Sequence, residues 1–150
     1  MQLPHLKSFR NQPLVFLTAC IAKRKQILAN DTAVSALKNI WQRSAELDGW
    51  FVGRFVIMPD HVHLFARAAI EAKPLATWIK TWKSLSAREL TAELNLAPPI
   101  WQRDYFDHFV RSAGSYSEKW EYVRNNPVRK GLVKRVEEWP HQGELHALQF

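Results

Sequence analysis

The sequence predicts an α+β fold in which an antiparallel sheet carries two helices on one of its faces. Three observations lead to this prediction. Several short runs are rich in β-branched and aromatic residues, which is typical of strands. Two longer segments repeat apolar residues at helical spacing. These elements follow one another in the order strand, helix, strand, strand, helix, strand, which is the order of a split βαβ unit.

The size and composition of the chain suit one folded domain. The chain has 150 residues, and hydrophobic residues make up 47% of it. This is enough apolar material for a packed core and excludes wholesale disorder. We therefore interpret residues 1–150 as a single domain, with a loose polar arm at residues 1–12 and a C-terminal extension at residues 134–150.

The first two elements are a strand over residues 14–21 and a helix over residues 31–48. The strand is short and apolar, and a basic loop at residues 22–25 follows it. Asn30 or Asp31 can cap the helix, and Gly49 ends it. The apolar stripe of this helix consists of Val34, Leu37, Trp41 and Ala45.

A hairpin follows, with strands over residues 50–58 and 61–68. Only Pro59 and Asp60 separate these two strands, so we expect them to be antiparallel neighbours. A second helix runs from Pro74, which suits a first helical turn, to about Leu94. Its expected buried stripe consists of Leu75, Ile79, Trp82 and Leu85.

The last predicted elements are a strand near residues 104–109 and a helix over residues 115–126, which Pro127 stops. The whole set corresponds to the ferredoxin-like, split βαβ arrangement with an added C-terminal helix. In this layout one face of the sheet is free of the two packed helices. That face is available for chemistry.

Two histidines lie at the start of the third predicted strand, in the segment Met58-Pro59-Asp60-His61-Val62-His63-Leu64. Alternate residues of a strand project to the same face, so His61 and His63 are expected side by side. Val62 and Leu64 then point to the opposite face, against the helices. Two adjacent imidazoles on the open face are what a metal site there needs.

The last helix carries groups that complement the histidine pair. Tyr122 and Asn126 are four residues apart, so they share a helical face. If this helix crosses the open face of the sheet, all four side chains can converge. Two imidazoles and an amide oxygen can hold a divalent cation, and a phenol beside it can act as a nucleophile on a phosphate. Tyr105 and Tyr116 are the competing nucleophiles, and Asp60 and Asp107 are polar neighbours without an assigned role.

Three motifs together resemble one family. They are the histidine pair in its Met-Pro-Asp context, the segment 101–108 (Trp-Gln-Arg-Asp-Tyr-Phe-Asp-His), and the segment 122–133, which begins Tyr-Val-Arg-Asn-Asn-Pro. In these features the chain resembles the REP-associated tyrosine transposases, which belong to the wider class of single-tyrosine HUH transposases of insertion sequences. The resemblance runs from about Leu14 to Trp139, which is nearly the whole chain.

The resemblance implies a metal-dependent endonuclease and strand transferase that acts on single-stranded DNA. It implies that His61 and His63 are metal ligands, that the metal is Mg²⁺ or Mn²⁺, and that Tyr122 forms a covalent 5′-phosphotyrosine. Asn126 matches the position of a polar third ligand, which is often glutamine in related transposases. The implied substrate is a hairpin of a palindromic repeat with a short flanking guide sequence. The protein is expected to be a monomer or a homodimer.

The charge of the chain agrees with a nucleic-acid partner. The formal net charge is +7, and excess positive charge favours polyanions. Bases could stack on Trp or Phe side chains. The predicted DNA-binding residues are Lys80, Lys83, Arg88, Arg103 and Arg124. A single cysteine, Cys20, and the lack of an apolar run long enough to span a bilayer lead us to expect a cytoplasmic protein that does not associate with membranes.

Two other functions stay open at this point. A split βαβ sheet can also serve as a non-catalytic module that binds single-stranded nucleic acid. A zinc hydrolase with an activated water is the other alternative, although such sites usually have three firm protein ligands. A covalent intermediate between protein and DNA distinguishes the transposase from both.

Overall fold

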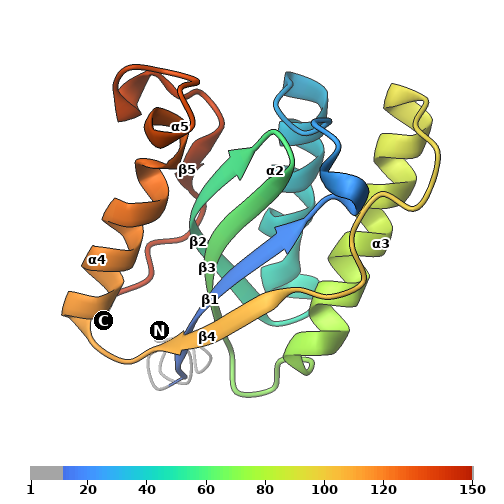
Figure 1. Cartoon of the computed structure of the whole chain (residues 1–150). Coiled ribbons are helices and arrows are strands. Elements are labelled where there is room, and N and C mark those ends of the chain that lie inside the picture. Colours follow the sequence, from blue (N-terminus) through green and yellow to red (C-terminus); the bar gives the residue numbers. More distant parts are fainter. Residues whose placement is uncertain (1–11, 150) are drawn as a thin grey trace.

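The computed structural model describes residues 12–149, so the predicted arm lies almost wholly outside the described residues. Figure 1 shows a central sheet with α2 and α3 on one side and α4 on the other. In chain order the elements are β1 (Leu14–Cys20), a 3₁₀ turn (Ala22–Arg24), α2 (Asp31–Leu47), β2 (Trp50–Met58), β3 (His61–Ala68), α3 (Leu75–Leu94), β4 (Phe106–Val110), α4 (Ala113–Arg124), α5 (Asn126–Arg129), a second 3₁₀ turn (Val136–Glu138) and β5 (Gln142–Glu144).

The sheet has the strand order β4-β1-β3-β2-β5, and every neighbouring pair is antiparallel. Its first four strands have the ferredoxin-like order, which confirms the predicted fold class. The three-residue strand β5 was not predicted and adds to the edge of β2. It comes from the C-terminal extension, and three residues are too few to show an alternating pattern.

The register of β3 sets the position of the histidines. His61 pairs with Cys20 of β1 and with Met58 of β2, next to the tight turn of the hairpin. His63 pairs with Thr18 of β1. Since β3 lies between β1 and β2, both histidines stand in the middle of the sheet rather than at an edge.

The main core fills the space between the sheet and helices α2 and α3. Trp41, Trp78 and Trp82 are fully buried there, and Val62 and Leu64 point into it as predicted. Two indoles find hydrogen-bond partners on the helices. The indole of Trp78 donates to the Ser44 hydroxyl at 2.8 Å, and that of Trp101 donates to the Ser86 hydroxyl at 2.9 Å.

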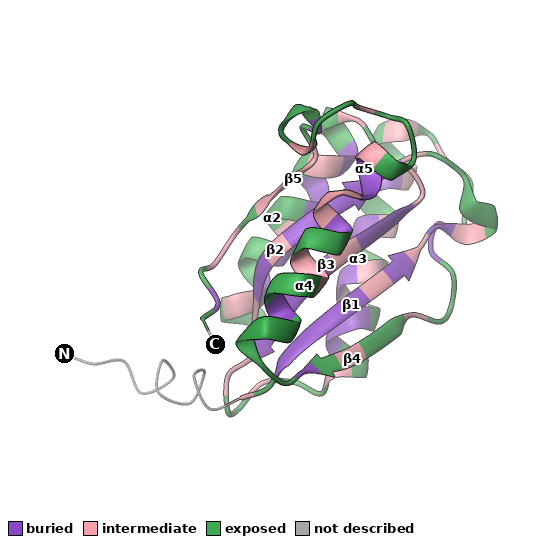
Figure 2. Cartoon of the chain, turned by 60° about the vertical axis from the view of Figure 1, so that its left-hand side comes forward, coloured by how far each residue is buried: buried purple, intermediate pink, exposed green. Residues whose placement is uncertain are grey.

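A smaller core lies on the other face of the sheet, where α4 covers part of β2 and β3. Phe65 of β3 packs there with Tyr116 and Val123 of α4 and with Trp139. In Figure 2 this face has buried strands in its middle and an exposed outer strand, β4. The added helix therefore leaves the outer strand β4 largely uncovered.

Two local predictions were wrong. Leu85 is 39% exposed, because the buried stripe of α3 continues from Trp82 to Ser86 and then to Leu90. A small residue suits that position, since its hydroxyl accepts the hydrogen bond from Trp101. The predicted last helix is also divided, because α4 ends at Arg124 and Pro127 lies in the first turn of α5.

None of the helices in the described part of the chain is long and apolar enough to cross a membrane.

Candidate active site

His61 and His63 face each other on the side of the sheet opposite α2 and α3. Their Nε2 atoms lie 3.1 Å apart, and the ring planes are almost perpendicular. His61 is buried and His63 is partly buried. The predicted side-by-side arrangement on one face is therefore present, and it follows directly from the alternation of side chains along β3.

The Nδ1 atoms of both rings are engaged by neighbouring side chains. Nδ1 of His61 lies 2.7 Å from the Asp60 carboxylate, which only accepts, so His61 donates from Nδ1. Nδ1 of His63 lies 2.8 Å from the Thr18 hydroxyl. The Arg24 side chain donates to the other oxygen of Asp60 at 2.9 Å. These contacts leave the Nε2 atom of His61 with a free lone pair directed at His63.

Asn126 completes the cluster from a different part of the chain. Its amide nitrogen lies 3.2 Å from Nε2 of His61 and 3.3 Å from Nε2 of His63, and the residue is buried. A rotation of the amide by a half turn puts its oxygen in the same place. The interruption between α4 and α5 positions this side chain, since Asn125 caps α4 and Asn126 begins α5.

The three groups fit a divalent cation. Metal–nitrogen and metal–oxygen bonds of about 2.1 Å at right angles hold two ligand atoms about 3 Å apart. The observed separation of the two Nε2 atoms is 3.1 Å. Two lone pairs at this distance repel each other unless a cation or a proton lies between them. Within residues 12–149 no three His, Cys, Asp or Glu side chains cluster for a metal, and the candidate third ligand beside the two histidines is the Asn126 amide.

The surroundings of the histidines keep both rings neutral. Burial, and after it the positive charges of His61, Lys119, Arg129 and Arg24, lower the pKa of His63 to about 3. Burial also lowers the pKa of His61, although Asp60 opposes this. A neutral imidazole is the form that binds a metal. Burial raises the pKa of Asp60, but the hydrogen bonds from His61 and Arg24 outweigh it and keep that pKa below its ordinary value.

Tyr122 is the accessible tyrosine of the chain. It is 63% exposed on α4, whereas Tyr116 is buried against Phe65 and Tyr105 is partly buried. The guanidinium of Arg129 lies 3.9 Å from the centre of the Tyr122 ring. Tyr122 comes one helical turn before Asn126, and within the described residues no hydrogen bond joins its hydroxyl to the histidine pair. It is therefore open to solvent, on the helix that leads to Asn126.

Comparison with known protein families decides the identity. The family described as "Transposase IS200 like" matches residues 14–126, which include the histidine pair, Tyr122 and Asn126. The chain belongs to this family. Members of a transposase family process DNA, so this chain is a transposase-like protein.

Two relatives bear related names. A Haemophilus influenzae protein, named among the REP-associated tyrosine transposases, is 24% identical over 144 residues, covering 90% of this transposase and 81% of the relative. The REP-associated tyrosine transposase of Escherichia coli is 26% identical over 98 residues. The match covers 65% of this chain and 53% of the Escherichia coli protein. A solved REP-associated tyrosine transposase, described as bound to a REP hairpin, shares the fold with a TM-score of 0.71 at 22% identity. That match covers 87% of this chain and 76% of the solved one.

The transposase carries most of its predicted DNA-binding residues away from the histidine cluster. Lys80, Lys83 and Arg88 lie on α3, which covers the opposite face of the sheet. The Lys83 ammonium donates to the backbone carbonyls of Gln102 and Asp104 at 2.9 and 3.1 Å, and burial lowers its pKa. Arg103 is exposed in the segment after α3, and Arg124 on α4 pairs with Glu121.

Sequence reasoning missed four residues around the cluster. Thr18 and Arg24 contact the cluster only through the fold, so no local pattern reveals them. Asp60 precedes the histidine pair and was left without a role. Lys119 lies three residues before Tyr122 on α4, and this helical spacing could have identified it.

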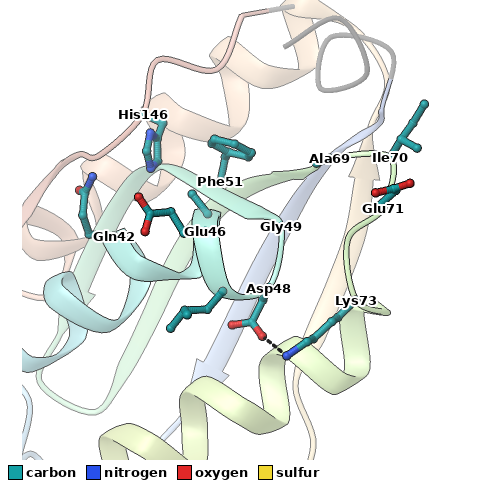
Figure 3. A pocket seen from close by; sticks show the side chains of 12 residues that line it. Gln42, Glu46, Asp48, Gly49, Phe51, Ala69, Ile70, Glu71, Lys73 and His146 are labelled. Carbon is teal, nitrogen blue, oxygen red and sulfur yellow. Dashed lines mark ion pairs between the residues drawn. The ribbon is translucent and has the colours of Figure 1, made fainter. Parts of the chain in front are cut away.

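A separate pocket of about 950 Å³ lies at the far end of α2. Figure 3 shows its lining, which includes Glu46, Asp48 and Glu71, and the ion pair between Lys73 and Asp48. The Lys73 ammonium lies 2.9 Å from the Asp48 carboxylate. None of the cluster residues contributes to this pocket. Its acidic side chains are unfavourable for a polyanionic strand.

Proposed function

We propose that this transposase is a metal-dependent endonuclease and strand transferase for single-stranded DNA, with Tyr122 as the nucleophile. The observation that carries this proposal is the convergence of His61, His63 and Asn126 beside an exposed tyrosine. Such a cluster has no structural purpose of its own, because burying polar groups costs free energy that an apolar core would not require. Membership of the transposase family supports the same conclusion.

The proposed reaction is a transesterification. The Tyr122 hydroxyl loses its proton and its oxygen attacks the phosphorus of a phosphodiester. The bond from phosphorus to the 3′ oxygen breaks, and that oxygen takes up a proton. The products are a 5′-phosphotyrosine and a free 3′-hydroxyl. One phosphodiester is exchanged for another, so the strand can be resealed or transferred without another source of energy.

His61, His63 and Asn126 are the residues that would hold Mg²⁺ or Mn²⁺ in this proposal. When bound, the cation polarises the phosphate and offsets its developing negative charge. Asp60 and Thr18 fix the orientation of the two rings, and Arg24 holds Asp60 in place. Arg129 packs over the Tyr122 ring, which restricts the position of the phenol.

The proposed substrate is a DNA hairpin with single-stranded flanks and a short guide sequence. The solved structure with the same fold is described as bound to a REP hairpin, and this supports a hairpin here. The positive net charge of +7 supports a polyanionic partner. With such a substrate, the proposed activity is strand transfer within palindromic repeats.

The test is incubation of the protein with single-stranded hairpin DNA and Mn²⁺, followed by denaturing electrophoresis. The wild type should give a covalent protein–DNA adduct. Tyr122→Phe should abolish the adduct and the cleavage while DNA binding stays near normal, and Tyr105→Phe serves as the matched control. An active Tyr122→Phe protein overturns the assignment. Binding without an adduct under any condition favours a non-catalytic module, and cleavage without an adduct favours a hydrolase.

A further inference from the structure

A row of aromatic rings crosses the sheet from its outer edge to the histidine pair. The ring centres of Phe106 and His108 lie 5.7 Å apart, and those of His108 and Phe16 lie 5.6 Å apart. Phe16 in turn stacks on His63, with centres 5.6 Å apart and planes 17° apart. The row runs over the adjacent strands β4, β1 and β3. These four residues are called the aromatic row below.

The strand register explains why the four rings share a face. Phe16 pairs with His108, and Thr18 pairs with both Phe106 and His63. Alternate residues of each strand point to the same side, so the row lies on the face opposite α2 and α3. Rings that adjoin across strands keep one another in place. The row is therefore a fixed surface that ends at the proposed active site.

The outer end of the row is exposed. Phe106 is 57% exposed and His108 partly so, whereas Phe16 is only 3% exposed. An exposed aromatic ring at a sheet edge contributes little to the core of this protein. Six of the seven tryptophans are buried, which leaves them unable to stack on a ligand: Trp41, Trp50, Trp78, Trp82, Trp101 and Trp139. Phe106 of β4 is thus available for stacking near the site.

Positive charge lies along the row. The Lys119 ammonium sits 5.0 Å from the centre of the Phe16 ring. Lys119 and Arg111 line a groove of about 500 Å³ between β4 and α4, together with His108, Tyr122 and the acidic Glu118. The groove thus extends from His108 of the row to the proposed nucleophile. Burial, and after it the charge of Lys119, lower the pKa of His108, so its ring is neutral.

We propose that Phe106 and His108 stack bases of single-stranded DNA while Lys119 and Arg111 bind its phosphates, so that the strand enters the active site along this groove. This inference rests on the proposed function, because it assigns the path of the same substrate. Flat rings beside cations match the alternating bases and phosphates of an unpaired strand. A duplex does not fit, because its bases are already stacked on each other. Since every base has a stacking face, recognition along this path tolerates any sequence.

The test compares two probes on the full chain by fluorescence anisotropy. One is a labelled oligonucleotide of about twelve thymidines, and the other is an abasic chain of equal length, both within the site sizes of single-strand binders. The wild type should bind the thymidine probe about tenfold more tightly than the abasic probe. Phe106→Ala should remove most of this difference, and Phe106→Trp should restore it. Lys119→Ala should weaken binding of both probes equally.

Phe109→Ala is the matched control. Phe109 lies on the same strand, borders the groove and is 48% exposed, but its pairing with Val15 directs its side chain to the face that α2 and α3 cover. An equal loss in Phe106→Ala and Phe109→Ala, or a wild type that does not distinguish the probes, overturns the inference. The adduct assay is independent of this result. If the wild type forms no adduct with hairpin DNA but still prefers the thymidine probe through Phe106, the proposed function is wrong. The proposed DNA-binding path along the groove is then still supported.

Discussion

Asp60 and His61 are neighbours in the chain, and their side chains are also bonded, with Oδ1 of Asp60 2.7 Å from Nδ1 of His61. This contact fixes the tautomer of the ring and directs the Nε2 lone pair at His63. Under the proposed function, this contact preorganises the two histidines as metal ligands. A role for Asp60 thus follows from geometry, whereas its position in the sequence suggested none.

Removing the charge of Asp60 should weaken metal binding. We expect Asp60→Asn to lower the affinity for Mn²⁺ by about 10–100-fold, because an outer carboxylate orients the ligand ring and raises its basicity. Titration calorimetry or Mn²⁺ paramagnetic resonance measures this. Asp107→Asn is the control, since Asp107 is exposed on β4. Equal affinities of the wild type and Asp60→Asn would contradict the role given to Asp60.

Thr18 should act on the second ring in the same way. Thr18→Val keeps the shape of the side chain but removes the hydroxyl that lies 2.8 Å from Nδ1 of His63. We expect about a tenfold loss of Mn²⁺ affinity. Thr18→Ser retains the hydroxyl and should retain most of the affinity. If both variants bind alike, the hydroxyl does not position the ring.

Metal should stabilise the folded protein. A ligand that binds only the folded state contributes about 2.7 kcal/mol at a concentration of one hundred times its Kd. We expect Mn²⁺ to raise the thermal midpoint of the chelator-treated wild type and to leave that of His63→Gln nearly unchanged. Differential scanning fluorimetry measures both. An equal rise in His63→Gln would show that the cation binds elsewhere.

Without metal, acid should destabilise the fold through His63. Its pKa is about 3 in the folded protein, against about 6.5 in an unfolded chain. Between these values the unfolded chain binds a proton that the folded chain excludes. This contribution is therefore fully present above about pH 6.5 and is lost progressively as the pH falls towards 3. Urea unfolding between about pH 7.5 and about pH 5 should show a weaker pH dependence in His63→Gln. Parallel curves for both proteins would refute this.

Lys83 should stabilise the fold rather than contribute mainly to DNA binding. Its ammonium donates to the carbonyls of the segment after α3, so Lys83→Ala should lower the free energy of unfolding by about 1 kcal/mol. Lys80→Ala is the control, because Lys80 is exposed on the same helix. Chemical denaturation measures the difference. If Lys83→Ala is as stable as Lys80→Ala but binds DNA more weakly, the original DNA-binding prediction is the better one.

Local patterns in the sequence were sufficient for most of the fold. The two runs over residues 50–58 and 61–68 predict both strands of the hairpin with their observed bounds, and the two-residue connection predicts their antiparallel pairing. Side chains alternate between the two faces along each strand. The same alternation assigns His61 and His63 to one face and Val62 to the other. The helical pattern was insufficient at Leu85, because it does not distinguish Leu85 from the neighbouring Ser86. Ser86 is the buried residue, and its hydroxyl accepts a hydrogen bond from the indole of Trp101, which is distant in the sequence.

The sequence by itself determined the fold class, the histidine pair and the family, because side-chain alternation and motif spacing are local properties of the chain. Only the tertiary structure decided what surrounds that pair. Thr18 and Arg24 reach the histidines through strand pairing and the turn after β1, which no local pattern encodes. The sequence suggested Asn126 as a neighbour of the pair, but its observed position depends on the break between α4 and α5. The aromatic row has the same origin, since Phe106, Phe16 and His63 share a face only because three strands pair in one register.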